Sequence, residues 1–132
     1  MKILYLCGLY AEALAPILKG YIRHGRMQDA ANIYQTAVLE GLVENAVDFH
    51  VLSFPFLPCY PHNFRSMVVP EGQIIYGGKV VGKSLAYSSL LLYKPFSIMS
   101  AVRKYVQAWI KENVNENEPF AVLTYSYVYF FI

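Results

Sequence analysis

The sequence predicts an α/β domain in which a mostly parallel sheet is flanked by helices, as in Rossmann-like folds. The chain opens with a strand pattern over residues 2–8, in which the apolar residues 3–7 follow one another without a break, and a helical pattern follows at residues 27–42. A second alternation comes from the helical pattern at residues 97–113 and the apolar run at residues 120–132. Because strands that alternate with helices are joined by crossover connections, we expect these strands to run parallel.

The first predicted strand, residues 2–8, is typical of a strand buried on both faces, because its apolar residues run without alternation. It ends at Gly8, where a residue without Cβ permits a tight turn. Residues 11–21 have a helix-forming composition that Pro16 interrupts. They therefore predict a loop with one short helical stretch.

The first long helix is predicted over residues 27–42, where apolar side chains recur at close to helical spacing. A second strand is predicted over residues 47–54. Three prolines follow this strand: Pro55, Pro58 and Pro61. Because proline has no backbone N–H to donate, this part of the chain is expected to be an irregular loop.

Two short apolar runs, residues 73–76 and 79–92, are the next strand signals. Gly77 and Gly78 separate them, as in a hairpin turn. The same glycines begin a match to the phosphate-binding pattern G-x-x-x-x-G-K-S over residues 77–84. Bulky residues stand where a phosphate would approach the backbone, and the last strand has no aspartate to help hold Mg²⁺. The hairpin is therefore preferred, and a nucleotide-binding loop stays an alternative.

The clearest helical pattern covers residues 97–113, with one apolar and one charged face. Its apolar stripe consists of Ile98, Val102, Tyr105 and Trp109. We expect Trp109 to pack on the sheet beside Val102 and Tyr105. The polar residues 113–118 and Pro119 end the helix, and residues 120–132 are then expected to form another core strand.

The composition limits the classes of function. Hydrophobic residues make up 56% of the chain and charged residues 15%, which predicts a well-covered sheet or a surface that meets another domain. The net charge of +2 and the scattered Lys and Arg residues argue against a dedicated nucleic-acid binder. No membrane-spanning helix is expected, because Pro95 interrupts the apolar residues 84–102 and residues 120–132 are too few.

Histidines and cysteines give little sign of a catalytic centre. His24, His50 and His62 are far apart in the sequence, so neither a metal site nor a cofactor is expected, and catalytic residues stay unassigned. His50 and His62 are interpreted mainly as structural or exposed residues. The two cysteines, Cys7 and Cys59, suggest no disulfide, and the N-terminus does not have the pattern of a signal peptide. A cytoplasmic location is therefore expected, which includes the inner face of the membrane.

Candidate ligand-binding residues stand where strands end and where the first long helix begins. The opening turns of that helix are polar and contain Gln28, Asn32 and Gln35. The free backbone N–H groups at a helix start favour anions. In a parallel sheet all these places meet at one edge. The candidate site residues are Gly8, Leu9, Gln28, Asn32, Tyr125 and Ser126. The alternative is that Gln28 and Asn32 only hold down the loop over residues 11–25.

The chain resembles bacterial family 4 glycosyltransferases. The resemblance is carried by residues 2–10, by residues 26–35, which include the pattern Q-x-A-A-N, and by residues 39–42. Residues 105–111 and 122–126 also resemble the front half of that family.

The resemblance implies the N-terminal, Rossmann-like half of a GT-B enzyme, spanning residues 1–132 as one incomplete acceptor-side domain. In that family this half binds the acceptor, and a C-terminal half, absent from these residues, binds the nucleotide sugar. The expected partners are thus a glycan or lipid-linked acceptor, a nucleotide sugar only with the missing half, and the membrane surface as a peripheral contact. Nucleic acid is not an expected partner.

A different class of function stays open. The chain could be a non-catalytic α/β binding or interaction domain that docks a partner through an apolar edge. The apolar residues 120–132 are the sequence feature that favours this alternative.

Overall fold

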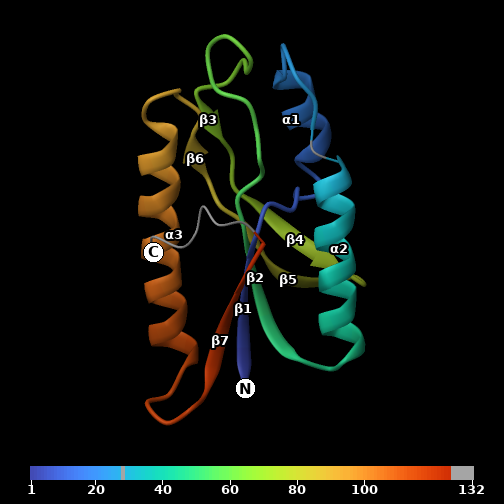
Figure 1. Ribbon diagram of the computed structural model, residues 1–132, viewed down its shortest axis with the longest axis vertical. Coiled ribbons are helices and arrows are strands. Elements are labelled where there is room, and N and C mark those ends of the chain that lie inside the picture. The colour runs from blue at the N-terminus through green and yellow to red at the C-terminus, as the bar shows by residue number, and fades with distance from the viewer. Residues whose placement is uncertain (28, 126–132) are drawn as a thin grey trace.

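The computed structural model describes residues 1–27 and 29–125 and has a five-stranded sheet with helices on both faces (Figure 1). Its elements are β1 (Lys2–Cys7), α1 (Ala15–Tyr21), α2 (Asp29–Glu44), β2 (Asp48–Ser53), β3 (Val68–Val69), β4 (Gly72–Tyr76), β5 (Lys79–Ser84), β6 (Tyr87–Ser88), α3 (Lys94–Asn113) and β7 (Phe120–Thr124). The predicted α/β class is confirmed.

The strand order in the sheet is β4-β5-β2-β1-β7, and β3 pairs with β6 in a separate two-stranded ribbon. β1 pairs in parallel with β2 and β7, and β2 pairs in parallel with β5. Only β4 runs antiparallel within the sheet, where it pairs with β5. The prediction that the first, second and last strands are parallel neighbours is therefore confirmed.

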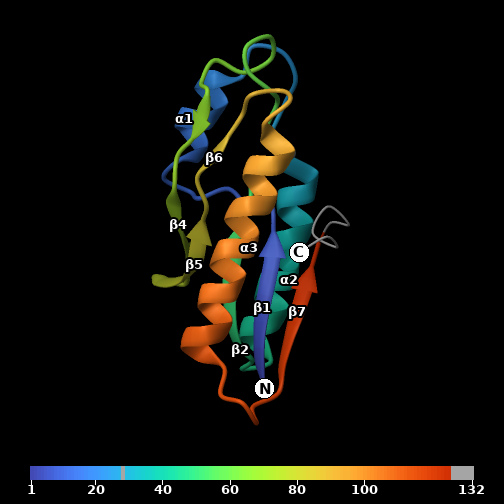
Figure 2. The same cartoon turned by 90° about the vertical axis from the view of Figure 1, so that its left-hand side faces the viewer.

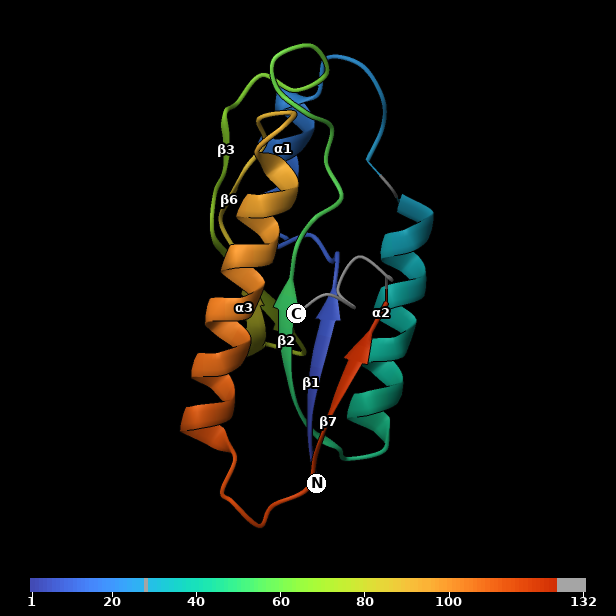
Figure 3. The same ribbon diagram turned by 60° about the vertical axis from the view of Figure 1, so that its left-hand side comes forward.

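Alternate residues of β1 face different helices, so the sheet separates two cores. Leu4 and Leu6 pack in a buried cluster with Val102 of α3, while Tyr5 and Cys7 pack in a second cluster with Leu39 of α2. Figures 2 and 3 show α3 on one face of the sheet and α2 on the other, with α1 at the end where the parallel strands finish. This two-faced burial explains the unbroken apolar run of β1.

Trp109 lies where the helical stripe places it. It is buried in the cluster that contains Val102 and Val106, and Tyr105 packs against the same cluster. Its ring lies 6.4 Å from the ring of His50 in β2, measured between centroids. The predicted packing of Trp109 on the sheet is confirmed.

Two prolines stand inside the first turns of helices. Pro16 belongs to α1 and Pro95 to α3, each at the N1 or N2 position. A missing N–H costs nothing there, because the first N–H groups of a helix have no partner within the helix. The predicted short helical stretch is thus α1, and α3 begins three residues before the predicted position 97.

The end of the chain differs from the expectation of a core strand. β7 lies at the edge of the described sheet, and Phe120, Val122 and Leu123 keep 39–44% of their surface exposed. The apolar composition was therefore misleading, because a strand with one neighbour and partial helix cover leaves its side chains accessible. Residues 126–132 lie outside the described residues.

Among the residues that the structure describes, no helix combines the length and the apolar character needed to cross a bilayer.

Candidate functional site

The carboxyl ends of β5, β2, β1 and β7 lie at the same edge of the sheet. The chain leaves β1 toward α2 on one face, whereas it reaches β7 from α3 on the other face. The gap between β1 and β7 is therefore the point where the strand order reverses. In open α/β sheets, this point is where ligands commonly bind.

Gly8 follows β1 at this edge and is held by α2. Its N–H donates a hydrogen bond to Oε1 of Gln35, a fully buried side chain whose Nε2 donates to the carbonyl of Ala31 at 2.9 Å. A Cβ at Gly8 would lie 2.4 Å from the ring of Phe56. The requirement for glycine thus comes from close aromatic packing, and Gln35 is an internal anchor rather than a residue that faces the crevice.

Asn32 lies one helical turn before Gln35 and faces the same loop. The N–H of Tyr10 donates to its Oδ1 at 3.3 Å, so the amide ties the loop after β1 to α2. Tyr10 comes directly before the loop over residues 11–25, so the role of Asn32 in holding that loop stays a prediction. Asn32 and Tyr10 also line a cavity of about 750 Å³, together with Glu12 and Lys19, so a ligand could still reach Asn32.

Leu9 is buried under α2, and its carbonyl accepts a hydrogen bond from Oγ of Ser53. Its side chain therefore belongs to the core and offers nothing to a ligand. Ser53, at the end of β2, is also fully buried, so this contact fixes the loop after β1 onto the neighbouring strand.

Tyr125 closes the other side of the crevice. Its N–H donates to the carbonyl of Leu6 at 3.0 Å, which keeps it in line with β7. The ring centroid of Tyr125 lies 5.5 Å from that of Tyr34 on α2 and 6.2 Å from that of Phe56. Three aromatic rings from α2, the loop after β2 and the end of β7 thus meet at the predicted edge.

A cavity of about 310 Å³ lies beside these rings. It is lined by Tyr5, Tyr34, Thr124 and Tyr125 among others. The hydroxyl of Tyr5 is buried and has no hydrogen-bond partner among the described residues. Burial raises the pKa of Tyr5, and the neighbouring Cys7 adds to this shift, so the hydroxyl stays protonated and can donate. An unpaired buried hydroxyl is the kind of group that a bound polar ligand could satisfy.

Of the six candidate residues, the structure brings Gly8, Asn32 and Tyr125 to one edge and places Leu9 in the core beside them. Gln28 and Ser126 lie outside the described residues. The sequence did not single out Tyr5, Tyr34 or Phe56; a clue existed for Tyr34, which stands two residues after Asn32 near the start of α2. That these residues bind a ligand stays a prediction.

Cys7 is a poor nucleophile despite its place near the site. Burial raises the pKa of its thiol to about 12, and hydrogen bonds with Leu9 and Ser53 offset only part of that shift. Since the thiolate is the reactive form, Cys7 acts as a small apolar core residue at neutral pH.

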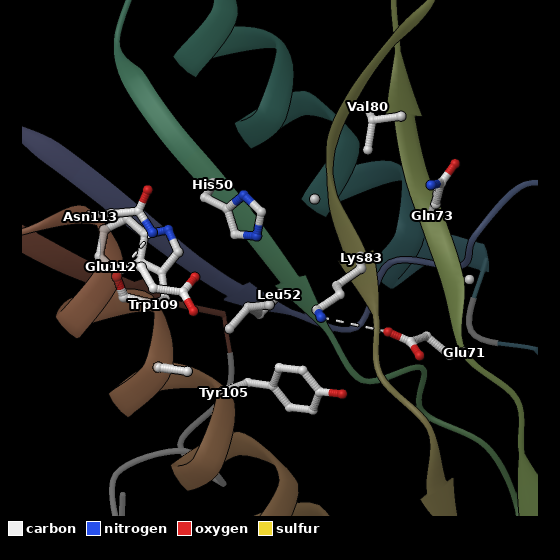
Figure 4. A pocket seen from close by; sticks show the side chains of 13 residues that line it. His50, Leu52, Glu71, Gln73, Val80, Lys83, Tyr105, Trp109, Glu112 and Asn113 are labelled. Atoms are coloured by element: carbon white, nitrogen blue, oxygen red, sulfur yellow. Dashed lines mark hydrogen bonds and ion pairs between the residues drawn. The ribbon is translucent and has the colours of Figure 1, made fainter.

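A second cavity, of about 640 Å³, lies between α3 and the strands β2, β5 and β4 (Figure 4). Nζ of Lys83 lies 3.6 Å from Oε1 of Glu71 and 4.1 Å from the centroid of the Tyr105 ring. Burial lowers the pKa of His50, and the charge of Lys83 adds to the effect, so His50 is neutral at pH 7. This cavity lies on the α3 face of the sheet and extends from His50, which pairs with Leu4 in the middle of β1, to Lys83 near the carboxyl end of β5.

The phosphate-loop alternative is wrong. Gly77 and Gly78 have φ angles of 58° and 77° and form the turn between β4 and β5, and the rest of the pattern is strand β5. A Cβ at Gly82 would lie 2.0 Å from the carbonyl oxygen of Val51, so this glycine serves close strand pairing. The N–H groups that would hold a phosphate are thus engaged in a sheet.

No set of three metal-ligating side chains is found among residues 1–27 and 29–125. The fold and the edge therefore define a Rossmann-like α/β domain whose accessible chemistry comes from aromatic rings, hydroxyls and amides. No protein-family model, curated protein or solved structure matches this chain.

Proposed function

We propose that this chain is the acceptor-binding portion of a glycosyltransferase that moves a sugar from a nucleotide-sugar donor to a glycan or lipid-linked acceptor. The observation that carries the proposal is the meeting of Tyr34, Tyr125 and the Tyr5 hydroxyl beside the point where the strand order reverses. The resemblance of residues 2–10 and 26–35 to family 4 glycosyltransferases supports the same assignment.

The chemistry of this edge suits a sugar. A pyranose has an apolar face that can pack on a tyrosine ring, and its hydroxyls both donate and accept hydrogen bonds. Tyr34 is 60% exposed and tilted against Tyr125, while the unpaired hydroxyl of Tyr5 lies in the same cavity. The amide of Asn32, which both donates and accepts, lines the adjacent cavity.

The proposal assigns no donor site and no catalytic group to these residues. Sugar transfer requires the acceptor hydroxyl and the donor carbon to be held about 3–3.5 Å apart in the right orientation. In a GT-B enzyme that geometry arises between two domains, so these 132 residues supply one wall of the cleft. A cytoplasmic location belongs to the proposal and is supported by two cysteines that form no disulfide.

The proposal can be tested by following backbone amide NMR signals while short oligosaccharides are added to the ¹⁵N-labelled chain. We expect saturable shifts at Gly8, Asn32, Tyr34 and Tyr125, and none of comparable size with nucleotide sugars. Tyr34→Ala should abolish the shifts. Tyr93→Ala is a matched control, because Tyr93 is 58% exposed but lies at the start of α3, away from the cavity. Equal loss in both variants would contradict the proposal.

One observation favours the non-catalytic alternative. Phe120, Val122 and Leu123 of β7 are partly exposed at the edge of the described sheet, where another chain could pair with them. Under this alternative, oligosaccharides cause no shifts, whereas amides of β7 change with protein concentration.

A further inference from the structure

The cavity between α3 and the strands β2, β5 and β4 has features of a ligand site that the proposed function does not use. Its volume is about 640 Å³, and it lies on the α3 face of the sheet (Figure 4). The aromatic crevice beside Tyr5 and Tyr34 lies on the α2 face. A ligand in this cavity would therefore bind independently of the crevice.

The sheet supplies one wall of the cavity, with polar side chains in fixed positions. Lys83 of β5 pairs with Gln73 of β4, and Glu71 stands two residues before Gln73. Because side chains two residues apart in a strand share a face, Glu71 and Lys83 are diagonal neighbours across the antiparallel pair. Nζ of Lys83 lies 3.6 Å from Oε1 of Glu71. This wall thus presents a cation and a carboxylate side by side.

The helix α3 supplies the opposite wall, which is largely aromatic. Tyr105, Ala108 and Trp109 line the cavity at the i, i+3 and i+4 positions of one helix face. Figure 4 shows Tyr105 reaching toward Lys83, whose Nζ lies 4.1 Å from the centroid of the ring. Leu52 of β2 is buried and lines the cavity between the two walls. The cavity therefore combines a charged side with a flat apolar side.

The charges of the cavity disfavour a simple ion as its ligand. The charged side chains among the described residues that line it are one lysine, Lys83, and two glutamates, Glu71 and Glu112. Burial and the charge of Lys83 lower the pKa of His50, so its ring adds no charge at neutral pH. A phosphate-like anion would meet two carboxylates, and an amine alone would meet Lys83. A ligand that carries both charges can be placed so that each charge meets its opposite.

The ion pair of Lys83 with Glu71 is open enough to exchange partners. Its 3.6 Å separation exceeds the length of a charge-assisted hydrogen bond, about 2.7–2.9 Å. The two side chains are 35% and 51% exposed, and exposed pairs of this kind add little to stability. Opening the pair for a ligand therefore costs little and leaves both groups within reach.

We propose that this cavity binds a zwitterionic α-amino acid with an aromatic side chain. In such a molecule the ammonium nitrogen and a carboxylate oxygen lie about 3 Å apart, close to the separation of Nζ and Oε1 in the ion pair. The ligand carboxylate accepts hydrogen bonds from Nζ of Lys83, and the ligand ammonium donates to Glu71. The ligand ring packs against Tyr105 and Trp109, as aromatic pairs do in offset or edge-to-face arrangements.

The paired charges favour this class over an uncharged ligand. A neutral ligand either leaves the ion pair intact or separates Lys83 from Glu71 without giving either group a new charged partner. A zwitterion gives each of them a partner of opposite charge. The inference is independent of the proposed sugar chemistry, because it uses none of the residues of the crevice.

The experiment follows the fluorescence of Trp109 while L-phenylalanine is added to the purified chain at neutral pH. Trp109 is the one tryptophan of the chain and lines the cavity, so its emission reports ligand entry. Phenylalanine does not emit in the range of tryptophan. We expect a saturable change in emission.

Three smaller or simpler ligands test each part of the recognition. Phenethylamine lacks the carboxylate, and hydrocinnamate lacks the ammonium. Each should bind at least about tenfold more weakly than phenylalanine, because one charged group of the cavity stays unpaired. Glycine keeps both charges but has no ring, and it should also bind at least about tenfold more weakly.

Two substitutions test the charged wall. Lys83→Met and Glu71→Gln should each weaken the binding of phenylalanine about tenfold or more. Lys104→Met and Glu40→Gln are the matched controls, because both side chains are exposed and neither lines this cavity. Neither control should alter the binding.

A further pair of variants tests the helix wall without loss of a core side chain. Ala108 is exposed and lines the cavity, so Ala108→Phe should fill the space and abolish binding. Gln107→Phe adds the same ring at the next exposed position of α3, outside the cavity, and should leave binding unchanged. Circular dichroism melting of each variant excludes unfolding as the cause of a loss.

Four results would overturn the proposal. They are no fluorescence change in the folded chain, binding of a single-charge analogue as tight as that of phenylalanine, equal loss in the charge controls, and equal loss in Gln107→Phe. A response of Trp109 to oligosaccharides but not to phenylalanine would also overturn it and would assign the cavity to sugar. Oligosaccharide shifts at the crevice without any phenylalanine binding would leave the proposed function standing and remove only this inference.

Discussion

The two ends of the parallel strands differ in charge and in how their polar groups are used. At the amino end, residues 40–48 contain three acidic and no basic residues, and residues 111–118 contain three acidic residues and one lysine. The polar contacts there, such as the 3.4 Å ion pair of Lys2 with Glu118, lie at the surface. At the carboxyl end, Gln35 and Ser53 make fully buried hydrogen bonds.

This difference teaches where the molecule is specialised. At the amino end, exposed hydrogen bonds and an ion pair hold the short loops between helices and strands. Substitutions there should cost little stability, because water can replace a lost hydrogen-bond partner. The carboxyl end uses buried polar anchors to hold loops in fixed positions beside an aromatic crevice. Loops that a rigid sheet and helices hold in fixed positions often carry binding residues. The carboxyl end of the sheet therefore has the arrangement that is expected of a binding site.

The largest expected effect tests the core that supports both ends. Trp109→Ala should lower the free energy of unfolding by roughly 3–5 kcal/mol, because it leaves a cavity where a buried ring packs on the sheet. Chemical denaturation gives the measurement. Lys111→Ala, on the exposed face of the same helix, is the control and should change stability little. An unchanged midpoint for Trp109→Ala would contradict the described packing.

The next effect compares a hydrogen bond from each end. Gln35→Met keeps the side-chain volume but leaves the N–H of Gly8 without its acceptor, which should cost about 1–3 kcal/mol. Asn45→Ala removes an exposed side-chain bond, 2.7 Å from Nδ2 to the carbonyl of Gly41, and should cost well under about 1 kcal/mol. Similar losses for both variants would remove the proposed contrast between the two ends.

A smaller effect concerns pH and the cavity of Figure 4. Burial and Lys83 hold the pKa of His50 below its ordinary value of 6.5, so the unfolded chain binds a proton more readily than the folded chain. His50 therefore contributes full stability above about pH 6.5, and this contribution falls as the pH drops through the folded pKa. His50→Gln should flatten the loss of stability between about pH 7 and about pH 5. An unaltered slope in urea titrations would show that His50 is not desolvated.

Much of the fold could be predicted because burial leaves a simple pattern in the sequence. β1 is covered on both faces and reads as a continuous apolar run, and the stripe that contains Trp109 fixes the orientation of α3. β7 shows the limit of this reasoning. Its composition resembles that of β1, but exposure depends on which elements cover it, and a local pattern does not contain that information.

The candidate site was accessible to prediction only in part. Topology alone brings the residues after β1 and β7 to one edge, so the positions of Gly8 and Tyr125 follow from the order of elements. The role of Gln35 does not, because a polar residue near a helix start is usually solvated. Gln35 is a buried anchor because the loop after β1 lies against it and the N–H of Gly8 donates to its side chain. The ring of Phe56 packs on Gly8 from the loop after β2.

The smallest expected effect lies at the amino end, in the ion pair of Lys2 with Glu118. Their side chains are 27% and 30% exposed, so water and salt weaken the attraction. A double-mutant cycle with Lys2→Met and Glu118→Gln should give a coupling energy below about 1 kcal/mol, and about 0.5 M NaCl should reduce it further. Lys2→Met should cost more than Glu118→Gln, because Nζ of Lys2 also donates to the carbonyl of Asn113 and joins the end of α3 to β1. A coupling energy of several kcal/mol would instead make the amino end a fixed polar junction like the carboxyl end.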